Sequence, residues 1–114
     1  MKKLSGLTLA CVCLFAARVW AAEGAVGQGS EVCADLTKKV AANRELMTQT
    51  YFPWAQGYMS GVNGVLIANG RSYRDLTKDP AGQQKALLDY CTSRPKATFL
   101  DAVIATYEAR PIAK

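Results

Sequence analysis

The sequence predicts a small all-α, single-domain bundle of about four short helices with one disulfide. Apolar residues recur at helical spacing in successive segments, and no segment shows the strict apolar–polar alternation that is typical of a half-buried strand. The chain has 114 residues, of which 50% are hydrophobic and 20% charged. It therefore has room for one globular domain and is too apolar to be disordered.

Residues 1–21 have the features of a secretory signal peptide. The positive start Lys2-Lys3 precedes an apolar run over 4–17, and small side chains occupy the two positions within 19–21 that a signal peptidase reads. The run is shorter than the roughly 20 apolar residues that a membrane-spanning helix needs. We therefore expect cleavage after Ala21, with Ala22 as the alternative site, and a periplasmic mature chain without a membrane span. An uncleaved anchor and a lipoprotein modified at Cys11 are the alternatives to a cleaved signal peptide.

The cysteine pattern predicts one disulfide in the mature chain. Cys11 and Cys13 leave with the signal peptide, whereas Cys33 and Cys91 remain as an even pair. Pairing is the usual state of such cysteines in an oxidising compartment, and two buried free thiols are the alternative. The chain has no C-x-x-C motif, so neither a thioredoxin-like redox site nor covalent haem is expected.

The chain carries no histidine, which excludes histidine-based catalytic triads, histidine metal sites and imidazole pH switches. It has 14 basic and 9 acidic residues and a net charge of +5. Three of the basic residues lie in the expected signal peptide, which leaves a mature net charge of +2. So small an excess gives no reason to expect a nucleic-acid partner. Two cysteines without histidine make a poor metal site, and we expect no metal and no cofactor.

The expected helical domain spans 30–110 and follows a flexible N-terminal arm at 22–29, which is rich in glycine and alanine and shows no periodicity. Ser30 is a suitable N-cap, and Glu31 is favourable in the first turn of a helix. These signals predict a first helix over 31–43. The apolar residues on one face of this helix are Val32, Cys33, Leu36 and Val40.

A second helix is expected from near Thr50 to Asn69, with Pro53 tolerated in its first turn. Its apolar face consists of Trp54, Tyr58, Val62 and Val65. Beside that face runs a stripe of small residues, Gly57, Gly61, Gly64 and Ala68. Because each glycine in a helix costs about 1 kcal/mol relative to alanine, we expect the stripe to be a packing surface, within the monomer or in a homodimer. The alternative is that one of these glycines ends the helix.

Asp79-Pro80 predicts the start of a third helix, with Asp79 as its N-cap, after a connecting loop over 71–78. The polar stretch 92–95 ends this helix, and Pro95 can open the next one. The residues expected to be buried are Leu87, Leu88 and Cys91 in the third helix, and Phe99, Leu100, Val103, Ile104 and Tyr107 in the fourth.

No constellation of residues predicts an enzyme. Asp75 and Asp79 come nearest to a carboxylate pair, but a solvated loop and a helix cap account for them. The glycines of the second helix follow no strand and do not fit a phosphate-binding loop. Trp54 and Tyr58 could stack a ligand, although aromatic residues at helical spacing more often belong to a core.

Several short stretches between residues 33 and 107 carry a family resemblance: Cys33-Ala34-Asp35-Leu36, Trp54-Ala55-Gln56-Gly57-Tyr58, Leu88-Asp89-Tyr90-Cys91, Pro95 and Phe99-Leu100-Asp101-Ala102-Val103. Together they resemble the HdeA/HdeB group of small periplasmic helical proteins, known as acid-stress chaperones. The resemblance implies an all-α fold, one disulfide between the helices that carry the two cysteines, and the binding of unfolded periplasmic clients rather than catalysis. The expected partner or packing surface consists of Trp54, Gly57, Tyr58, Gly61, Val62, Gly64, Phe99 and Val103.

The glycine-rich stretch 57–64 resembles instead the G-Y-x-x-G segment of the Tai/Rap-type immunity proteins, which neutralise effectors of type VI secretion. This resemblance gives a second hypothesis, a dedicated effector-binding protein, and an accessory periplasmic protein is the third. For the chaperone hypothesis we expect activation by acid. Protonation of the nine carboxylates of the mature chain would bring its net charge toward +11 by about pH 2, and self-repulsion would loosen the helices.

Overall fold

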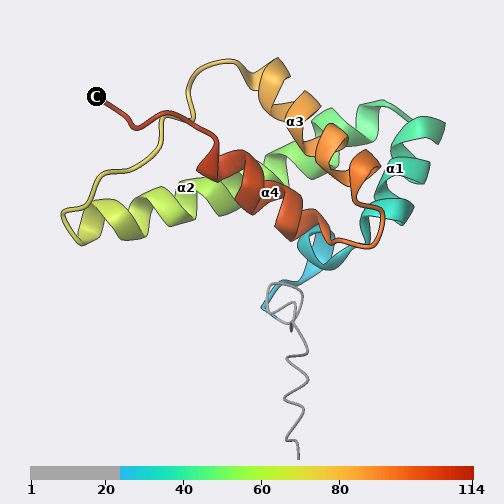
Figure 1. The fold of residues 1–114 in the computed structure, drawn as a ribbon, viewed down its shortest axis with the longest axis horizontal. Coiled ribbons are helices and arrows are strands. Elements are labelled where there is room, and N and C mark those ends of the chain that lie inside the picture. Colours follow the sequence, from blue (N-terminus) through green and yellow to red (C-terminus); the bar gives the residue numbers. More distant parts are fainter. Residues whose placement is uncertain (1–23) are drawn as a thin grey trace, which may run out of the picture.

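The computed structural model describes residues 24–114 (Figure 1). The signal peptide predicted at 1–21, with Cys11 and Cys13, lies outside the described residues. The helices of the described part are α1 at Cys33–Ala42, α2 at Phe52–Ala68, α3 at Pro80–Ser93 and α4 at Phe99–Glu108. Within 24–114 the only strand-like pairings are two isolated β-bridges, so the predicted all-α class is confirmed. None of these helices combines the length and apolar character needed to cross a membrane.

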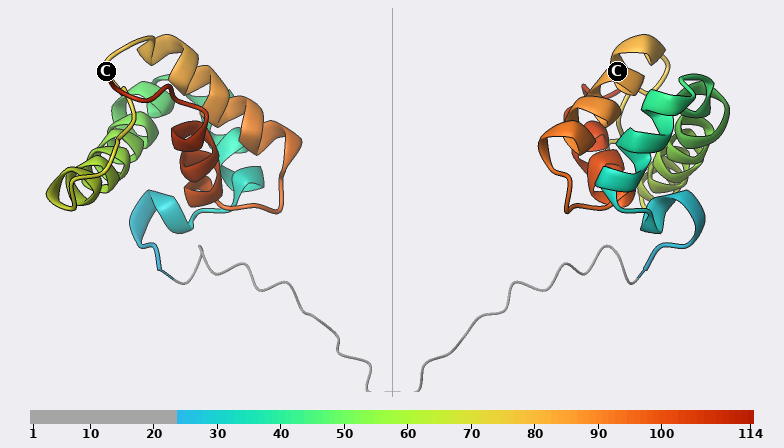
Figure 2. Two further views of the ribbon diagram at one scale, coloured as in Figure 1. Left: turned by 60° about the vertical axis from the view of Figure 1, so that its left-hand side comes forward. Right: turned by 90° about the vertical axis from the view of Figure 1, so that its right-hand side faces the viewer.

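The last helix, α4, lies at the centre of the bundle, where it packs against α2 and α3, while α1 packs against α3 (Figure 2). The side chains with no exposed surface come from all four helices and include Leu36, Met59, Leu87, Phe99 and Val103. Helices of 10 to 17 residues are too short to be stable in isolation. Their shared core around α4 is therefore what stabilises each of them.

The first helix begins later than its sequence signals predict. Residues 27–30 form a short 3₁₀-helix, η2 (Gly27–Ser30), and α1 starts only at Cys33, with Val32 as an N-cap that makes no side-chain hydrogen bond. The Ser30 hydroxyl donates to the carbonyl of Gly27 at 2.9 Å, so it closes η2 instead of capping α1. The expectation of a flexible arm over 22–29 is therefore wrong for residues 27–29.

The second helix begins earlier than predicted. A π-helical turn, η3 (Met47–Tyr51), runs directly into α2, whereas the sequence places the helix start near Thr50. The N–H of Phe52 donates to the carbonyl of Met47. Pro53 has no N–H, and in a regular helix its ring would clash with a carbonyl four residues earlier. The wider turn before it therefore accommodates this proline inside a continuous helix.

The buried face of α2 is rotated from the predicted one. The residues of α2 that enter the core are Phe52, Ala55 and Met59. Val65, which the sequence places on the apolar face, is instead 64% exposed. The other predicted members pack against the core from the side and are partly buried: Trp54, Tyr58 and Val62. Because α2 carries no charged residue on any side, apolar periodicity cannot identify which face turns inward.

Side-chain caps define the starts of the last two helices. Asp79 caps α3 as predicted, since its Oδ1 accepts a backbone N–H of the first turn at 3.0 Å. The prediction that Pro95 opens the next helix is wrong, because α4 begins only at Phe99. A capping box precedes α4, in which Asp101 accepts from the N–H of Thr98 at 2.8 Å and donates its own N–H to the Thr98 hydroxyl.

The C-terminal tail belongs to the fold beyond the predicted boundary at 110. Backbone hydrogen bonds of 2.8 and 2.9 Å join residues 73–75 to residues 111–113. From the other side, Asn63 on α2 accepts from the N–H of Arg74 and donates to its carbonyl, and it also accepts from the Tyr107 hydroxyl. The connecting loop is irregular as predicted, but it is fixed between α2 and the tail.

Candidate binding surface

The N-terminal segment 24–32, which we call the strap, contacts α2 and α4 through η2. Two backbone hydrogen bonds of 2.8 Å hold its C-terminal end against the turn that leads into α4. In the first, the N–H of Phe99 donates to the carbonyl of Glu31, and in the second, the N–H of Cys33 donates to the carbonyl of Ala97. The strap is thus attached to the bundle by its backbone just before α1 begins.

The side chain beneath the strap is Trp54, at the start of α2. Gly29 is buried so close to it that a Cβ at this position would lie 2.3 Å from the indole Cη2, so only glycine fits there. The indole stacks on Tyr58 with ring centroids 5.8 Å apart and lies 5.9 Å from the ring of Phe99. Phe99 in turn meets Tyr51 edge to face at 5.3 Å. Four aromatic side chains, the aromatic cluster, therefore lie in contact under or beside the strap.

Glu31 joins the strap to two other parts of the fold. Its Oε1 lies 2.5 Å from Lys39 Nζ on α1, and its Oε2 accepts from the Tyr51 hydroxyl at 2.7 Å. The hydrogen bond to Glu31 raises the pKa of Lys39. Burial, assisted by the same carboxylate, raises the pKa of Tyr51 well above its usual value. The Glu31 side chain is only 16% exposed, so this carboxylate is a shielded attachment point for the strap.

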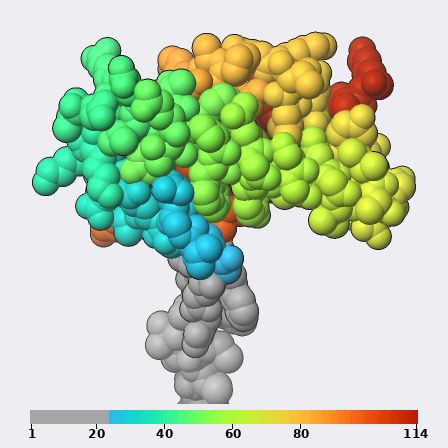
Figure 3. All heavy atoms as spheres, turned by 180° about the vertical axis from the view of Figure 1, so that it is seen from behind, coloured from blue at the N-terminus to red at the C-terminus, as the bar shows by residue number. Residues whose placement is uncertain are grey.

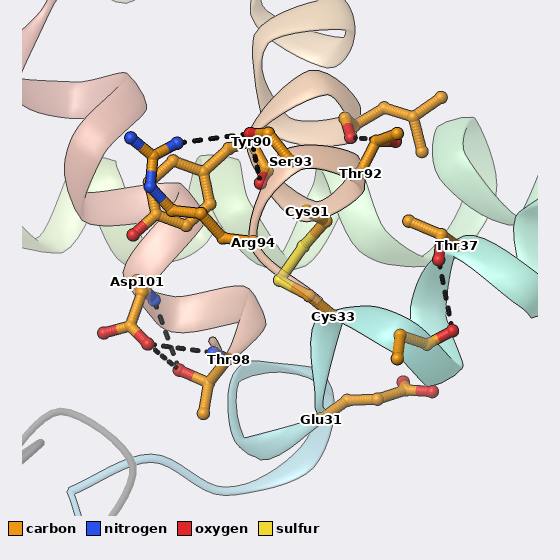
Figure 4. Close-up of a disulfide and its surroundings, with 12 residues drawn as sticks. Glu31, Cys33, Thr37, Tyr90, Cys91, Thr92, Ser93, Arg94, Thr98 and Asp101 are labelled. Carbon is orange, nitrogen blue, oxygen red and sulfur yellow. Dashed lines mark hydrogen bonds between the residues drawn. A yellow bond between two sulfur atoms is a disulfide. The ribbon is translucent and has the colours of Figure 1, made fainter. Parts of the chain in front are cut away.

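The predicted disulfide between Cys33 and Cys91 is present and joins the start of α1 to α3 (Figure 4). The two Cα atoms are 4.7 Å apart, and neither side chain has exposed surface. The bond links residues 58 positions apart. On the chain-entropy account, a loop of this length gives about 4 kcal/mol of stabilisation. The covalent link lies directly after the strap, so it holds α1 in place whatever the strap does.

The glycine stripe of α2 points away from the core. Gly57, Gly61 and Gly64 are exposed, and no atom lies within 4 Å of where a side chain would begin at any of them. The expectation that the stripe packs within the monomer is therefore wrong for the described part of the chain. Val65 and Ile67 beside it are 64% and 54% exposed. These five residues form an open, uncharged face of α2, the helix that runs across the side of the molecule shown in Figure 3.

The residues predicted as a partner or packing surface separate into four groups in the structure. Trp54 and Tyr58 belong to the aromatic cluster beside the strap, and the three glycines lie on the open face. Val62 is partly buried against the core. Phe99 and Val103 have no exposed surface, so they are core residues in this state, as their place on the apolar stripe of the fourth helix predicts, and a partner could reach them only after the bundle loosens.

Within residues 24–114, no group of three or more histidine, cysteine or carboxylate side chains is placed to hold a metal ion. In the same part of the chain, every buried side-chain nitrogen or oxygen has a hydrogen-bond partner, so none points to an absent cofactor. Two open hollows of about 520 and 530 Å³ lie beside α1 and beside the loop after α2, and neither includes the strap or Trp54.

Sequence periodicity does not identify three residues that position this surface, Gly29, Tyr51 and Asn63. Gly29 lies in a stretch whose composition is typical of a loose arm. Tyr51 lies at the very start of the predicted helix, before the residues that define its apolar face, and the structure places it in η3 and in the core. Asn63 is one of three residues of α2 with an amide or aliphatic hydroxyl side chain, together with Gln56 and Ser60, and the sequence does not distinguish it from the other two.

No protein-family model, no curated protein and no solved structure matches this chain.

Proposed function

We propose that this chain is an exported, non-enzymatic protein-binding domain that acts as a periplasmic acid-stress chaperone and holds unfolded clients when the pH falls. The observation that carries the proposal is the attachment of the strap, which depends on one carboxylate and a few backbone hydrogen bonds over an aromatic cluster. The signal features of residues 1–21 support export. The resemblance to the HdeA/HdeB group supports a client-binding role.

Carboxylates make many of the side-chain contacts that acid would weaken. Six of the eight carboxylates among residues 24–114 accept hydrogen bonds, namely Glu31, Glu45, Asp75, Asp79, Asp89 and Asp101. The hydroxyl and N–H of Thr77 lower the pKa of Asp75 from its usual 3.8. The stability that Asp75 contributes is therefore complete above that value and is lost as the pH falls through the lower folded pKa. Acid also increases the net positive charge, which favours looser states.

The surroundings of Glu31 favour release of the strap in acid. Lys39 faces it from α1 and Tyr51 from η3, while Asp35 on α1 acts on Lys39 and raises its pKa slightly further. The start of α4 presents the backbone N–H of Phe99 to the strap, and the carboxylate in its first turn, Asp101, accepts from Thr98 in the capping box. Loss of the negative charge at Glu31 leaves Lys39 charged and without its partner, which removes the ion pair. The disulfide keeps α1 and α3 joined under the same conditions.

The test follows Trp54 and a client together. In a Trp20→Phe background Trp54 is the only tryptophan, and its emission reports exposure of the aromatic cluster. Emission and the light scattering of an aggregating client are recorded from about pH 7 to about pH 2. We expect a red shift and suppression of aggregation to begin at the same pH. A protein that keeps its emission and lets the client aggregate over the whole range contradicts the proposal.

Two matched variants identify the carboxylate responsible. Glu31→Gln removes the charge that pairs with Lys39, so both transitions should begin at higher pH. Glu108→Gln removes an exposed carboxylate that accepts no hydrogen bond within the described residues, so it should leave both transitions unchanged. Equal behaviour of the two variants would show that general charge, and not the Glu31 attachment, controls activation.

The second candidate is an immunity protein that binds one secreted effector. The observation that favours it is the open face of α2, which includes the stretch 57–64 and is uncharged and uncovered without any release step. An effector encoded beside this gene should then bind the purified protein at neutral pH. Gly61→Leu, which places a bulky side chain on the open face, should abolish that binding and leave the fold intact. Binding at neutral pH that Gly61→Leu does not change would place the partner elsewhere.

A further inference from the structure

The strap covers Trp54 without burying any large apolar side chain of its own. Of its residues 24–32, only Gly29 is buried, whereas Val26 is 83% and Val32 42% exposed. A segment that buries so little apolar surface of its own loses little when it leaves, so its local opening requires much less free energy than global unfolding. In Figure 3 this segment lies on the surface of the molecule against α2.

The contact between the strap and the indole requires small residues. A Cβ at Gly29 would lie 2.3 Å from Cη2 of Trp54, and one at Gly27 would lie 3.8 Å from its Nε1. Gly27 also has a φ of +65°, a conformation that favours glycine. Ala25 folds back to within 3.1 Å of the same position at Gly29. The surface around the indole therefore accommodates a closely approaching backbone and excludes a side chain at the position of Gly29.

We propose that the strap is an internal pseudo-ligand, which occupies a peptide-binding surface formed by Trp54 and the neighbouring aromatic residues. Its release opens this surface to a short segment of another protein that adopts the same tight turn and presents glycine opposite the indole. The strap itself supplies the argument for this occupant, since it is the segment seated there and its sequence over 24–30 is Gly-Ala-Val-Gly-Gln-Gly-Ser. The proposal rests on the proposed protein-binding function and names the class of segment that the surface takes.

The experiment displaces the strap at neutral pH without changing a carboxylate. Gly29→Ala, in the Trp20→Phe background of the full chain, introduces the clash with Trp54. Gly57→Ala is the matched control, because nothing lies within 4 Å of the added methyl group. The probe is a fluorescent peptide with the sequence of residues 24–30, whose binding is measured by anisotropy. A second peptide has alanine in place of Gly29.

We expect Gly29→Ala to shift the Trp54 emission to the red and to bind the first peptide with a Kd at least tenfold lower than that of the parent or of Gly57→Ala. The second peptide, which has alanine in place of Gly29, should bind none of the three proteins. Unchanged emission together with equal peptide affinities in all three proteins would overturn the proposal. So would equal binding of the two peptides, because it would remove the requirement for glycine.

A second variant keeps the test decisive if Gly29→Ala loses its helical circular dichroism. Tyr51→Phe removes only the hydroxyl that donates to Glu31, so it should also lower the Kd of the first peptide, and failure to do so overturns the proposal. The acid assay on the parent chain separates this inference from the proposed function. Client protection without peptide binding refutes the pseudo-ligand alone, whereas peptide binding without client protection refutes the chaperone alone.

Discussion

Replacing Gly57, Gly61 and Gly64 with alanine should stabilise this protein. All three lie in the interior of α2, where glycine is less favourable than alanine by about 0.8–1 kcal/mol per residue. At each position a methyl group would meet no atom within 4 Å, so no steric term opposes the gain in helix propensity. The triple variant should therefore be more stable by roughly 2–3 kcal/mol.

The gain is large enough to measure by thermal and urea unfolding at neutral pH. For a domain of this size, 1 kcal/mol corresponds to about 4–8 °C in Tm, so the triple variant should melt on the order of 10–20 °C higher. Gly70→Ala serves as the opposite reference, because Gly70 has a φ of +65° and alanine is strained there. That variant should be less stable than the parent although its surroundings are equally open.

A loss of stability in the triple variant would refute this reasoning. It would mean that another backbone packs against the open face in solution, and sedimentation would then show a dimer in the parent and a smaller species in the variant. Gly61→Leu gives the same distinction more sharply. The open surroundings of Gly61 predict little loss of stability in a monomer, whereas in a dimer the larger side chain would cause overpacking, which typically costs about 1–3 kcal/mol.

Four further outcomes are expected from single changes or from pH. Cys33→Ser should lower the free energy of unfolding by about 4 kcal/mol in urea titrations, and equal stability would show that the loop constraint is unimportant. Thr98→Ala removes one side of the capping box and should cost about 1 kcal/mol, measured by thermal unfolding. Asn63→Ala removes three hydrogen bonds and leaves the groups they satisfied unpaired, which should cost about 2–3 kcal/mol in the same urea assay. Stability should fall below about pH 4, because the lowered pKa of Asp75 makes its contribution complete only above its usual value. Stability should also fall above about pH 10, because the raised pKa of Tyr51 makes its contribution complete below the usual value of 10.0 and lost as the pH rises further. A urea midpoint that stays constant across both ranges would contradict both assignments.

The fold class, the disulfide and one helix start could be predicted because each depends on a local or compositional signal. Asp79 followed by proline is a strong helix start, and the structure confirms it. Cys33 and Cys91 could be paired from their even number and expected compartment, and the structure confirms that too. These signals do not depend on how the helices are oriented relative to one another.

The face of α2 and the strap could not be predicted, for a common physical reason. Periodicity locates a buried face only where the opposite face is polar, and α2 lacks charges throughout. The π-turn before Pro53 extends the helical segment toward the N-terminus, and Tyr51 at its end is buried in the core. The strap packs through a glycine, and a glycine with no side chain gives no hydrophobic signal. Its contact with Trp54 exists only because the fold brings the two segments together.

The two candidate surfaces differ in when a partner can reach them, and this difference separates the two functional hypotheses. The open face of α2 is accessible at neutral pH, whereas the aromatic cluster becomes accessible only when the strap leaves. A chaperone that uses the cluster should be inactive at neutral pH, become active there in Gly29→Ala, and be indifferent to Gly61→Leu. An effector-binding protein that uses the open face should show the reverse sensitivity, because Gly61→Leu obstructs its contact and displacement of the strap does not affect it. Client protection and effector binding should therefore be measured on these two variants at one neutral pH, and the variant that changes either activity assigns the function to its surface. If neither variant changes either activity, the protein binds its partner through a region outside both surfaces.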